Sequence, residues 1–474
     1  MINLSKNKIA MRTLIRKMAV TAMLGMIPML NVCAQEEVQG FVHEQSAEDG
    51  YEWPTDKQVL NKLDQWQDQK FGVLMHWGLY SIQGIVESWS ICSEDVDWIS
   101  RNKHHLPYDD YKKWYWGQKD EFNPSKFDPD QWADMMQDAG VKYLIFTTKH
   151  HDGFCMYDSK FTNYSIAHSE AFKNNPKRDI ARHVFDAFRK KNFMIGCYFS
   201  KPDWHCPWFW SPEYATATRS INYKKERHPE WWSNYQKFTK NQLGELTTDY
   251  GKLDILWLDG GWVTGEDVGL DSILVEARKR NPGLISVDRA IKGRNENYQT
   301  PERGIPDRQL SYPWESCITL SWDWGWTPNA PYKSAQWIIN TLAEITAKGG
   351  CFALGIGPDQ YGQFDKAVAD RLHVVGEWLR KNGKAIYGTR NAKIYHDGNV
   401  WFTSSKDHKT TYAIYALPDN EKLPQTIEWT GNVPRKSIKM LATGKKLKFV
   451  KRDGRVKVTI PAGLKQESLA LEIN

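Results

Sequence analysis

The feature of this sequence that most constrains its fold is a series of short, almost continuously apolar segments separated by helical patterns. Strands without a polar face are typical of a parallel sheet that is buried on both sides. Six such strands are expected, at residues 71–78, 143–148, 193–199, 253–258, 284–287 and 351–356. Apolar periodicity predicts helices at residues 130–139, 180–191, 231–250, 270–280 and 335–347. We therefore expect an α/β chain with a (β/α)8-type, TIM-like barrel.

Polar residues close most of these strands or follow them directly. They are His76, Lys149-His150-His151-Asp152, Ser200-Lys201-Pro202-Asp203, Asp259 and Asp288-Arg289. In a parallel barrel the C-terminal strand ends meet on one face, and that face carries the active site. The sequence therefore predicts an active site assembled from several strand ends.

After residue 390 the pattern changes to short alternating strands separated by turn residues such as Asp453-Gly454. The expected strands are 400–404, 409–415, 425–429, 447–452 and 456–460. They predict a small C-terminal all-β sandwich domain. The expected division of the chain is a signal peptide at 1–34, a leader at 35–54, a catalytic barrel at 55–389 and the β-sandwich at 390–474.

The N-terminus has the pattern of a secretory signal peptide. Basic residues precede an apolar stretch over residues 18–30, and small residues favour cleavage after Ala34. The apolar stretch is too short for a stable membrane span. Cys33 offers a lipoprotein alternative, but the bulky Val32 before it matches that signal poorly. We expect a periplasmic or extracellular protein.

Composition excludes some partners and suggests others. The net charge is +6 over 474 residues with no long basic run, so nucleic acid is not expected as a partner. The chain has 23 Trp, 21 Tyr and 18 Phe, and flat aromatic rings suit the C–H faces of sugars. Cys155, Cys197 and Cys351 lie in apolar strands, where buried thiols are expected. No cysteine or histidine spacing is typical of zinc.

Asp259 is the first candidate catalytic residue. It closes an apolar strand and precedes two glycines, an arrangement that suits a glycosidase nucleophile, although a helix cap or an ordinary loop aspartate is the alternative. A second carboxyl group must protonate the leaving oxygen. Glu296, Glu302 and Glu315 follow the next strand, and the pattern alone leaves the three open.

His150 and His151 suggest a metal site at first sight. Neighbouring side chains on a strand point to opposite faces, so the pair is not expected to chelate one ion. At a strand end both can donate to sugar hydroxyls instead. We expect neither a metal nor an organic cofactor.

Five motifs, in order, resemble the α-L-fucosidases of glycoside hydrolase family 29. They lie at residues 71–81, 147–160, 254–260, 348–358 and 377–389, and together they span roughly residues 55–390. Motifs in a fixed order are far stronger than any single one. The resemblance implies an exo-acting, retaining α-L-fucosidase that releases terminal fucose from a fucosylated oligosaccharide or glycoconjugate by double displacement.

The resemblance also implies roles for particular residues. Asp259 falls on the nucleophile, and Glu302 falls on the acid/base by its Thr-Pro-Glu context. Glu315 is the second candidate for the acid/base. If Glu302 has that role, we expect Glu315 to line the pocket, hydrogen-bonded among Trp314, Trp322 and Trp324. The residues expected to contact substrate are His76, His150, His151, Tyr198, Arg289, Trp324, Glu315 and Trp89.

The sequence departs from the family pattern at three places. Gly355 stands where an asparagine is usual, and the usual Glu-Trp pair after the first strand appears as Glu87-Ser88-Trp89. Residues 321–326, Ser-Trp-Asp-Trp-Gly-Trp, are a variant of a Ser-Trp/Phe-Gly-Tyr pattern. Two alternatives remain: another exo-glycosidase on the same barrel, or a sugar-binding homologue without activity. A structural cell-surface protein is disfavoured by the polar strand ends.

Overall fold

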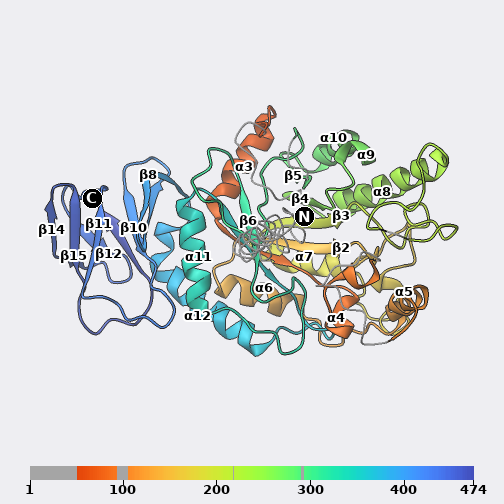
Figure 1. Ribbon diagram of the computed structural model, residues 1–474, viewed down its shortest axis with the longest axis horizontal. Coiled ribbons are helices and arrows are strands. Elements are labelled where there is room, and N and C mark those ends of the chain that lie inside the picture. Colours follow the sequence, from red (N-terminus) through yellow and green to blue (C-terminus); the bar gives the residue numbers. More distant parts are fainter. Residues whose placement is uncertain (1–50, 93–104, 217, 290–292) are drawn as a thin grey trace, which may run out of the picture. The chain divides into compact units, whose positions relative to one another are not determined.

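The computed structural model describes residues 51–92, 105–216, 218–289 and 293–474 (Figure 1). The predicted signal peptide and most of the predicted leader lie outside these residues. Within the described part of the chain, no helix has the length and apolarity needed to cross a membrane.

A seven-stranded parallel sheet forms the barrel. Its strands are β1 (Phe71–Met75), β2 (Tyr143–Lys149), β3 (Met194–Ser200), β4 (Ile255–Asp259), β5 (Ile285–Val287), β6 (Glu315–Thr319) and β7 (Cys351–Ile356). They pair in the order β5-β4-β3-β2-β1-β7-β6. Six of the seven strands were expected, and β6 was not, because it begins with a charged residue.

An irregular segment, residues 297–303, lies between β5 and β6. The Asn297 amide donates to the carbonyl of Ser286 in β5 at 2.9 Å. On the other side, the Glu315 amide donates to the Gln299 carbonyl and the Arg303 amide donates to the Cys317 carbonyl, each at 2.8 Å. The segment therefore serves as an eighth strand, and the predicted (β/α)8-type fold is confirmed.

Helices surround the sheet. The longer ones are α3 (Lys57–Gln69), α5 (Tyr108–Gly117), α6 (Pro129–Asp138), α7 (Ile180–Lys190), α8 (Pro229–Asp249), α10 (Leu270–Arg280), α11 (Ala335–Ala347) and α12 (Lys366–Asn382), and the short ones are α4 (Tyr80–Gln83) and α9 (Gly265–Val268). The five expected helices agree with these bounds to within two residues. Their starts follow from the sequence: at α6, for example, Asp128 accepts from the Gln131 amide and proline is the first helical residue.

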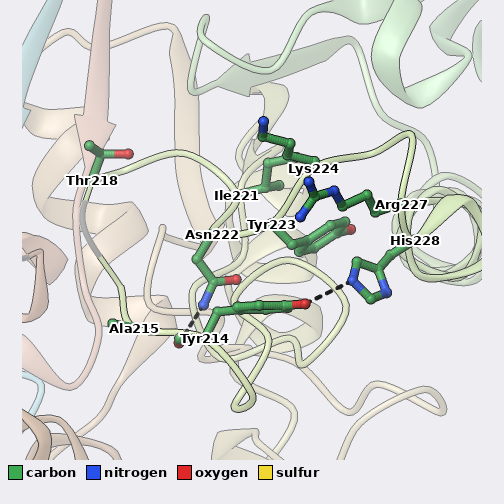
Figure 2. Close-up of a pocket in the computed structure, with 9 residues that line it drawn as sticks. All are labelled: Tyr214, Ala215, Thr218, Ile221, Asn222, Tyr223, Lys224, Arg227 and His228. Atoms are coloured by element: carbon green, nitrogen blue, oxygen red, sulfur yellow. Dashed lines mark hydrogen bonds between the residues drawn. The ribbon is translucent and has the colours of Figure 1, made fainter.

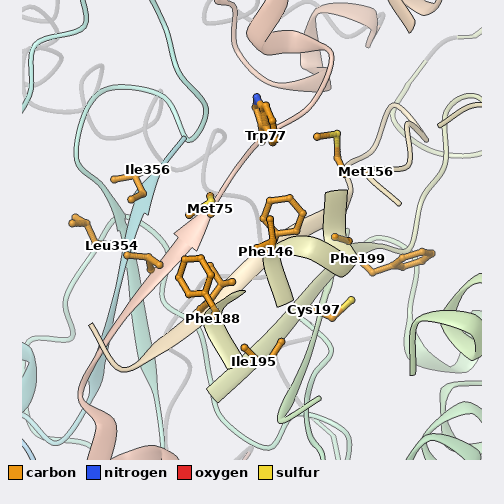
Figure 3. Close-up of a cluster of buried hydrophobic side chains, with 14 of the residues drawn as sticks. Met75, Trp77, Phe146, Met156, Phe188, Ile195, Cys197, Phe199, Leu354 and Ile356 are labelled. Carbon is orange, nitrogen blue, oxygen red and sulfur yellow. The ribbon is translucent and has the colours of Figure 1, made fainter. Parts of the chain in front are cut away.

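The core fills the space between strands and helices. Phe146 of β2, Ile195 of β3 and Phe188 of α7 belong to one cluster of buried side chains (Figure 3). Burying a large apolar side chain of this kind contributes about 1.5–3 kcal/mol. Cys155, Cys197 and Cys351 are buried thiols, as expected. This packing fixes the strand ends that carry the site.

The C-terminal region is all-β. A six-stranded sheet has the order β13-β12-β16-β10-β9-β8, and a three-stranded sheet has the order β11-β15-β14. Their strands are β8 (Thr389–Asp397), β9 (Val400–Ser405), β10 (Thr411–Tyr415), β11 (Thr426–Thr430), β12 (Ile438–Met440), β13 (Lys446–Leu447), β14 (Phe449–Arg452), β15 (Arg455–Thr459) and β16 (Leu469–Ile473). Side chains from both sheets, such as Phe402 and Trp429 with ring centroids 5.8 Å apart, share one core. The predicted all-β character is confirmed, although β8, β12 and β16 were not expected.

Candidate active site

Six of the residues selected from the sequence meet at the C-terminal edge of the barrel. They come from five consecutive strands: His76 after β1, His150 and His151 after β2, Tyr198 in β3, Asp259 at the end of β4 and Arg289 after β5. The rings of His76 and His150 lie 5.6 Å apart, centroid to centroid, and those of His150 and His151 lie 4.3 Å apart, while His151, Tyr198 and Arg289 each contact Asp259. The parallel topology accounts for the meeting, since every strand ends on this face.

Asp259 is the centre of these contacts. The Tyr198 hydroxyl donates to Oδ2, Arg289 Nε lies 3.5 Å from Oδ1, and His151 Nε2 lies 3.7 Å from Oδ2. Burial alone would raise the pKa of Asp259, but the positive charge of Arg289, together with the hydrogen bond that Tyr198 donates, holds that pKa well below its usual range. Asp259 is therefore a carboxylate at neutral pH, as a nucleophile must be.

Glycine is required directly after this carboxylate. Gly260 has a φ of +79°, and a Cβ there would lie 2.2 Å from Cδ of Pro202. The chain can therefore turn sharply away from Asp259 without placing a side chain over it.

Arg289 joins Asp259 to Glu302. Its Nη2 donates to Glu302 Oε2 at 2.5 Å, while its Nε faces Asp259, so both carboxyl groups lie on one guanidinium group. The ring of Trp257 lies 4.6 Å from the guanidinium carbon. Arg289 has a φ of +55°, which is uncommon for a residue with a side chain and is frequent at functional sites. This bridge places Glu302, and no other glutamate considered, beside Asp259.

The three histidines are neutral. Burial is the main cause: it lowers the pKa of His76 and of His150 to about 3, and it holds the pKa of His151 well below its usual value. Serine hydroxyls contact the Nδ1 atoms of two of them, Ser88 at 2.6 Å from His150 and Ser200 next to His151. These contacts leave each Nε2 for a ligand. Nδ1 of His76 is buried without a hydrogen-bond partner among the described residues.

Indole rings border the histidines on two sides. Trp324 lies 5.4 Å from His76, ring centroid to ring centroid, and Trp89 lies 5.2 Å from His151. Trp262, which the sequence pattern did not select, lies 5.0 Å from His151. Neutral donors next to aromatic faces suit a sugar, which has hydroxyl groups at its edge and C–H groups on its faces.

Trp324 is held in place by two features. Oε1 of the buried Glu87 accepts from the amides of Trp324 and Gly325, at 2.7 and 2.8 Å. Gly355 makes room for the indole, because a Cβ there would lie 2.6 Å from Cε3 of Trp324. The departure from the usual asparagine at Gly355 therefore has a physical reason: Trp324 occupies the space that a side chain would need.

Metal binding is the alternative use of this cluster. Among the residues that the structure describes, His150, His151 and Asp259 are the only group of three whose ligand atoms lie close enough, within 4.8 Å of one another, to share an ion. The guanidinium group of Arg289 lies 3.5 Å from Asp259 and would repel a cation there. The charges favour a neutral ligand that forms hydrogen bonds.

Glu315 lies elsewhere, at the N-terminal end of β6 inside the barrel. Its carboxyl group accepts from the Tyr143 hydroxyl at 2.7 Å and from Trp257 Nε1 at 3.3 Å. The expectation that it is hydrogen-bonded among Trp314, Trp322 and Trp324 is therefore wrong; the charge at position 315 concealed a buried strand.

Glu296, the third candidate, is also turned away from Asp259. Its Oε2 accepts from the backbone amide of Asp288 at 2.7 Å, and burial raises its pKa to about 8. It supports the turn after β5, next to the pair formed by Lys201 and Asp288.

Several residues that support the site were not assigned roles from the sequence. Ser88 and Ser200 set the histidine rings, and Glu87 holds the backbone beneath Trp324. Ser200 stands among the polar strand-end residues, which is a usable signal. Nothing in the local pattern around Glu87 or Ser88 predicts their partners, because those partners come from distant segments.

Glycoside hydrolases cleave their substrates with a pair of carboxyl groups, and Asp259 and Glu302 provide such a pair at the open edge of this barrel. The comparisons with known proteins give the family. The alpha-L-fucosidase family model matches residues 39–384, and the chain belongs to that family.

Individual relatives agree. Plasma alpha-L-fucosidase of Homo sapiens is 29% identical over 385 residues, which cover 75% of this chain and 76% of that protein. Alpha-L-fucosidase isoenzyme 1 from Paenibacillus thiaminolyticus has a TM-score of 0.74 at 27% identity, covering 88% of this chain and 99% of that one. The Thermotoga maritima alpha-fucosidase in complex with fucose has a TM-score of 0.70 at 26% identity, covering 89% and 100%.

Proposed function

We propose that this protein is an exo-acting, retaining α-L-fucosidase that removes terminal L-fucose from fucosylated glycans. The observation that carries the proposal is the Arg289 bridge, which brings Asp259 and Glu302 to one guanidinium group at the edge of the barrel. Retaining glycosidases need two carboxyl groups about 5–5.5 Å apart. Membership of the family supports fucose as the sugar.

The reaction is a double displacement. An oxygen of Asp259 attacks the anomeric carbon as the bond to the glycosidic oxygen breaks, and Glu302 gives that oxygen a proton. Glu302 then takes a proton from water, whose oxygen attacks the anomeric carbon and releases Asp259. Because Arg289 bonds Glu302 in this structure, we expect that contact to loosen when the leaving group enters.

Substrate recognition uses the neutral donors. His76, His150 and His151 are placed to hold the ring hydroxyls, and their low pKa values keep them uncharged at neutral pH. Fucose carries a methyl group on C5, and Trp324 supplies an apolar wall for it. A site built to bond hydroxyl groups rejects a sugar with the wrong hydroxyl configuration strongly.

The test is hydrolysis of 4-nitrophenyl α-L-fucoside beside a panel of other aryl glycosides and fucosylated oligosaccharides. The proposal expects turnover of the fucosides alone. Turnover of another glycoside at a higher rate would assign the site to a different exo-glycosidase, and no turnover at all would indicate a sugar-binding protein.

We also propose that the chain is exported and cleaved after Ala34. The basic residues, the apolar stretch at residues 18–30 and the small residues before Gln35 support this. Mass spectrometry of the exported protein should give a mature chain that begins at Gln35. An intact Met1, or a lipid on Cys33, would contradict it.

A further inference from the structure

The loop that connects β3 to α8 forms a cavity that is separate from the catalytic residues. Its volume is about 350 Å³, within the size range of small-molecule sites. Figure 2 shows the residues that line it: Tyr214, Ala215, Thr218, Ile221, Asn222, Tyr223, Lys224, Arg227 and His228. None of these residues takes part in the reaction described above.

The walls of this cavity have a positive charge. Lys224 and Arg227 are both exposed, neither has a side-chain partner among the described residues, and no acidic residue lines the cavity. Lys225, between them in sequence, is different, because it pairs with Asp267 at 2.6 Å. The two cations that face the cavity are thus the ones that the fold leaves without a counter-charge.

A larger cavity of about 560 Å³ near Asp249 shows that cationic lining alone is not unusual. There the charges are already paired, Lys160 with Asp249 at 2.7 Å and Arg182 with Asp179 at 3.0 Å. Both cations already have a carboxylate partner, so neither is available to an incoming anion. In the β3–α8 cavity only His228 has a carboxylate near it, Glu230 at 3.8 Å, and among the described residues Lys224 and Arg227 have none.

The cavity is built rather than a gap in a loose loop. The Asn222 side chain accepts from the Ser211 amide and donates to the Ser211 carbonyl, each at 2.8 Å. The Tyr223 hydroxyl donates to the Trp208 carbonyl at 2.6 Å. His228 Nε2 lies 3.0 Å from the Tyr214 hydroxyl (Figure 2). The exposed ring of Tyr214 offers a face for the C–H groups of a sugar ring.

The cavity is connected to the catalytic site through Arg219. This residue follows Thr218 of the cavity wall, and its guanidinium carbon lies 4.9 Å from the ring of Trp89 and 5.4 Å from that of Trp262. Both indole rings contact His151. The Arg219 carbonyl accepts from Nε1 of Trp204 at 3.0 Å and of Trp262 at 3.2 Å, which fixes this segment between the two sites.

We infer that the cavity binds an anionic sugar residue of the same glycan whose fucose lies at Asp259. The chemistry required is a sugar with a carboxylate or a sulfate ester, because Lys224 and Arg227 favour an anion and the exposed Tyr214 ring favours a sugar. This inference rests on the proposed function. It adds that branched, acidic fucosylated glycans are the preferred substrates.

The test compares kcat/KM for three matched oligosaccharides: a neutral fucosylated one, its sulfated form and its sialylated form. Wild type should prefer at least one anionic form by about tenfold at low salt, and the preference should decline as salt rises. Which form is preferred identifies the anion. K224Q/R227Q should remove the preference while leaving 4-nitrophenyl α-L-fucoside hydrolysis unchanged.

A matched control removes two positive charges nearby. Lys237 and Lys240 are exposed on α8 and do not line the cavity, so K237Q/K240Q should keep the preference. Equal rates on all three glycans, or equal loss in both double variants, would overturn the inference while leaving the proposed fucosidase activity intact. Failure to cleave any fucoside would contradict the proposed function itself and the inference with it.

Discussion

The edge of the barrel and its interior each hold a carboxyl group, and the two have opposite properties. Asp259 at the edge has a pKa well below its usual range, whereas burial raises the pKa of Glu315 in the interior to about 7. Their surroundings explain the difference. Asp259 faces the Arg289 guanidinium group at 3.5 Å, while Glu315 is bonded by the neutral Tyr143 and Trp257. Burial alone does not determine the ionisation state, because a charged partner can outweigh it.

The largest effect should come from removing the charge at the edge. Asp259→Asn keeps the shape of the side chain but cannot attack the anomeric carbon, so kcat should fall on the order of a thousandfold or more. Steady-state kinetics on the aryl fucoside, with a melting curve to show an intact fold, measure it. Near-wild-type turnover by a clean preparation would remove Asp259 from the mechanism.

The second effect distinguishes the two glutamates. Glu302→Ala should lose roughly a hundredfold or more on a natural disaccharide but much less on an activated aryl fucoside, because a good leaving group departs without a proton. Azide should restore turnover and give fucosyl azide, since it needs no general base. Glu315→Ala is the comparison, and we expect no rescue there. Rescue of the Glu315 variant instead would exchange the two roles.

A smaller loss of activity is expected from a substitution that displaces the Trp324 indole ring at the edge of the barrel. Gly355→Asn places side-chain atoms where Trp324 lies, so the wall of the sugar site must move. A displacement of this size should lower kcat/KM by about ten- to a hundredfold. Gly117→Asn is a suitable control, because no atom lies within 4 Å of a Cβ added there. Equal effects of the two substitutions would mean that Trp324 has no part in catalysis.

The smallest effect on activity is expected from a substitution of Glu315 in the interior of the barrel. Glu315→Gln keeps the shape of the side chain and one of its two acceptor oxygens, and it should change kcat only a few-fold. It should, however, alter the dependence of stability on pH. The raised pKa means that the folded protein binds the Glu315 proton more tightly than the unfolded chain, so this group's contribution to stability is present below about pH 4.5 and is lost as pH rises through about 7.

Thermal melting between pH 5 and pH 8 measures this contribution. Wild type should lose more stability over that range than Glu315→Gln, by at most about 3 kcal/mol. Identical pH profiles would show that Glu315 is ionised throughout, and the contrast with Asp259 would fail.

Much of the fold could be predicted from the sequence, because apolar strands and polar strand ends are local signals. Asp259 and the histidine pair are of this kind. The position of Glu302 is not, since it lies on an irregular segment whose pairing with β6 depends on backbone bonds to Cys317. A charged residue at the start of β6 also concealed a strand, because Glu315 is satisfied only by Tyr143 and Trp257 from other strands.

The Arg289 bridge likewise depends on tertiary structure. Arg289 and its two partners, Asp259 and Glu302, come from three separate parts of the chain, and Arg289 also has a left-handed backbone conformation. The local sequence pattern therefore identifies Arg289 only as a residue at a strand end. The role of Gly355 follows the same rule: the sequence shows a departure, and only the position of Trp324 explains it.

The most direct test of the central claim, that Asp259 is a nucleophile in a double displacement, is the anomeric configuration of the first fucose released. Proton NMR during rapid hydrolysis of 4-nitrophenyl α-L-fucoside follows both anomers before they equilibrate. Two inversions at the anomeric carbon predict that α-L-fucose appears first and the β anomer grows in later by mutarotation. Initial formation of β-L-fucose would mean a single displacement by water and would contradict the nucleophilic role of Asp259.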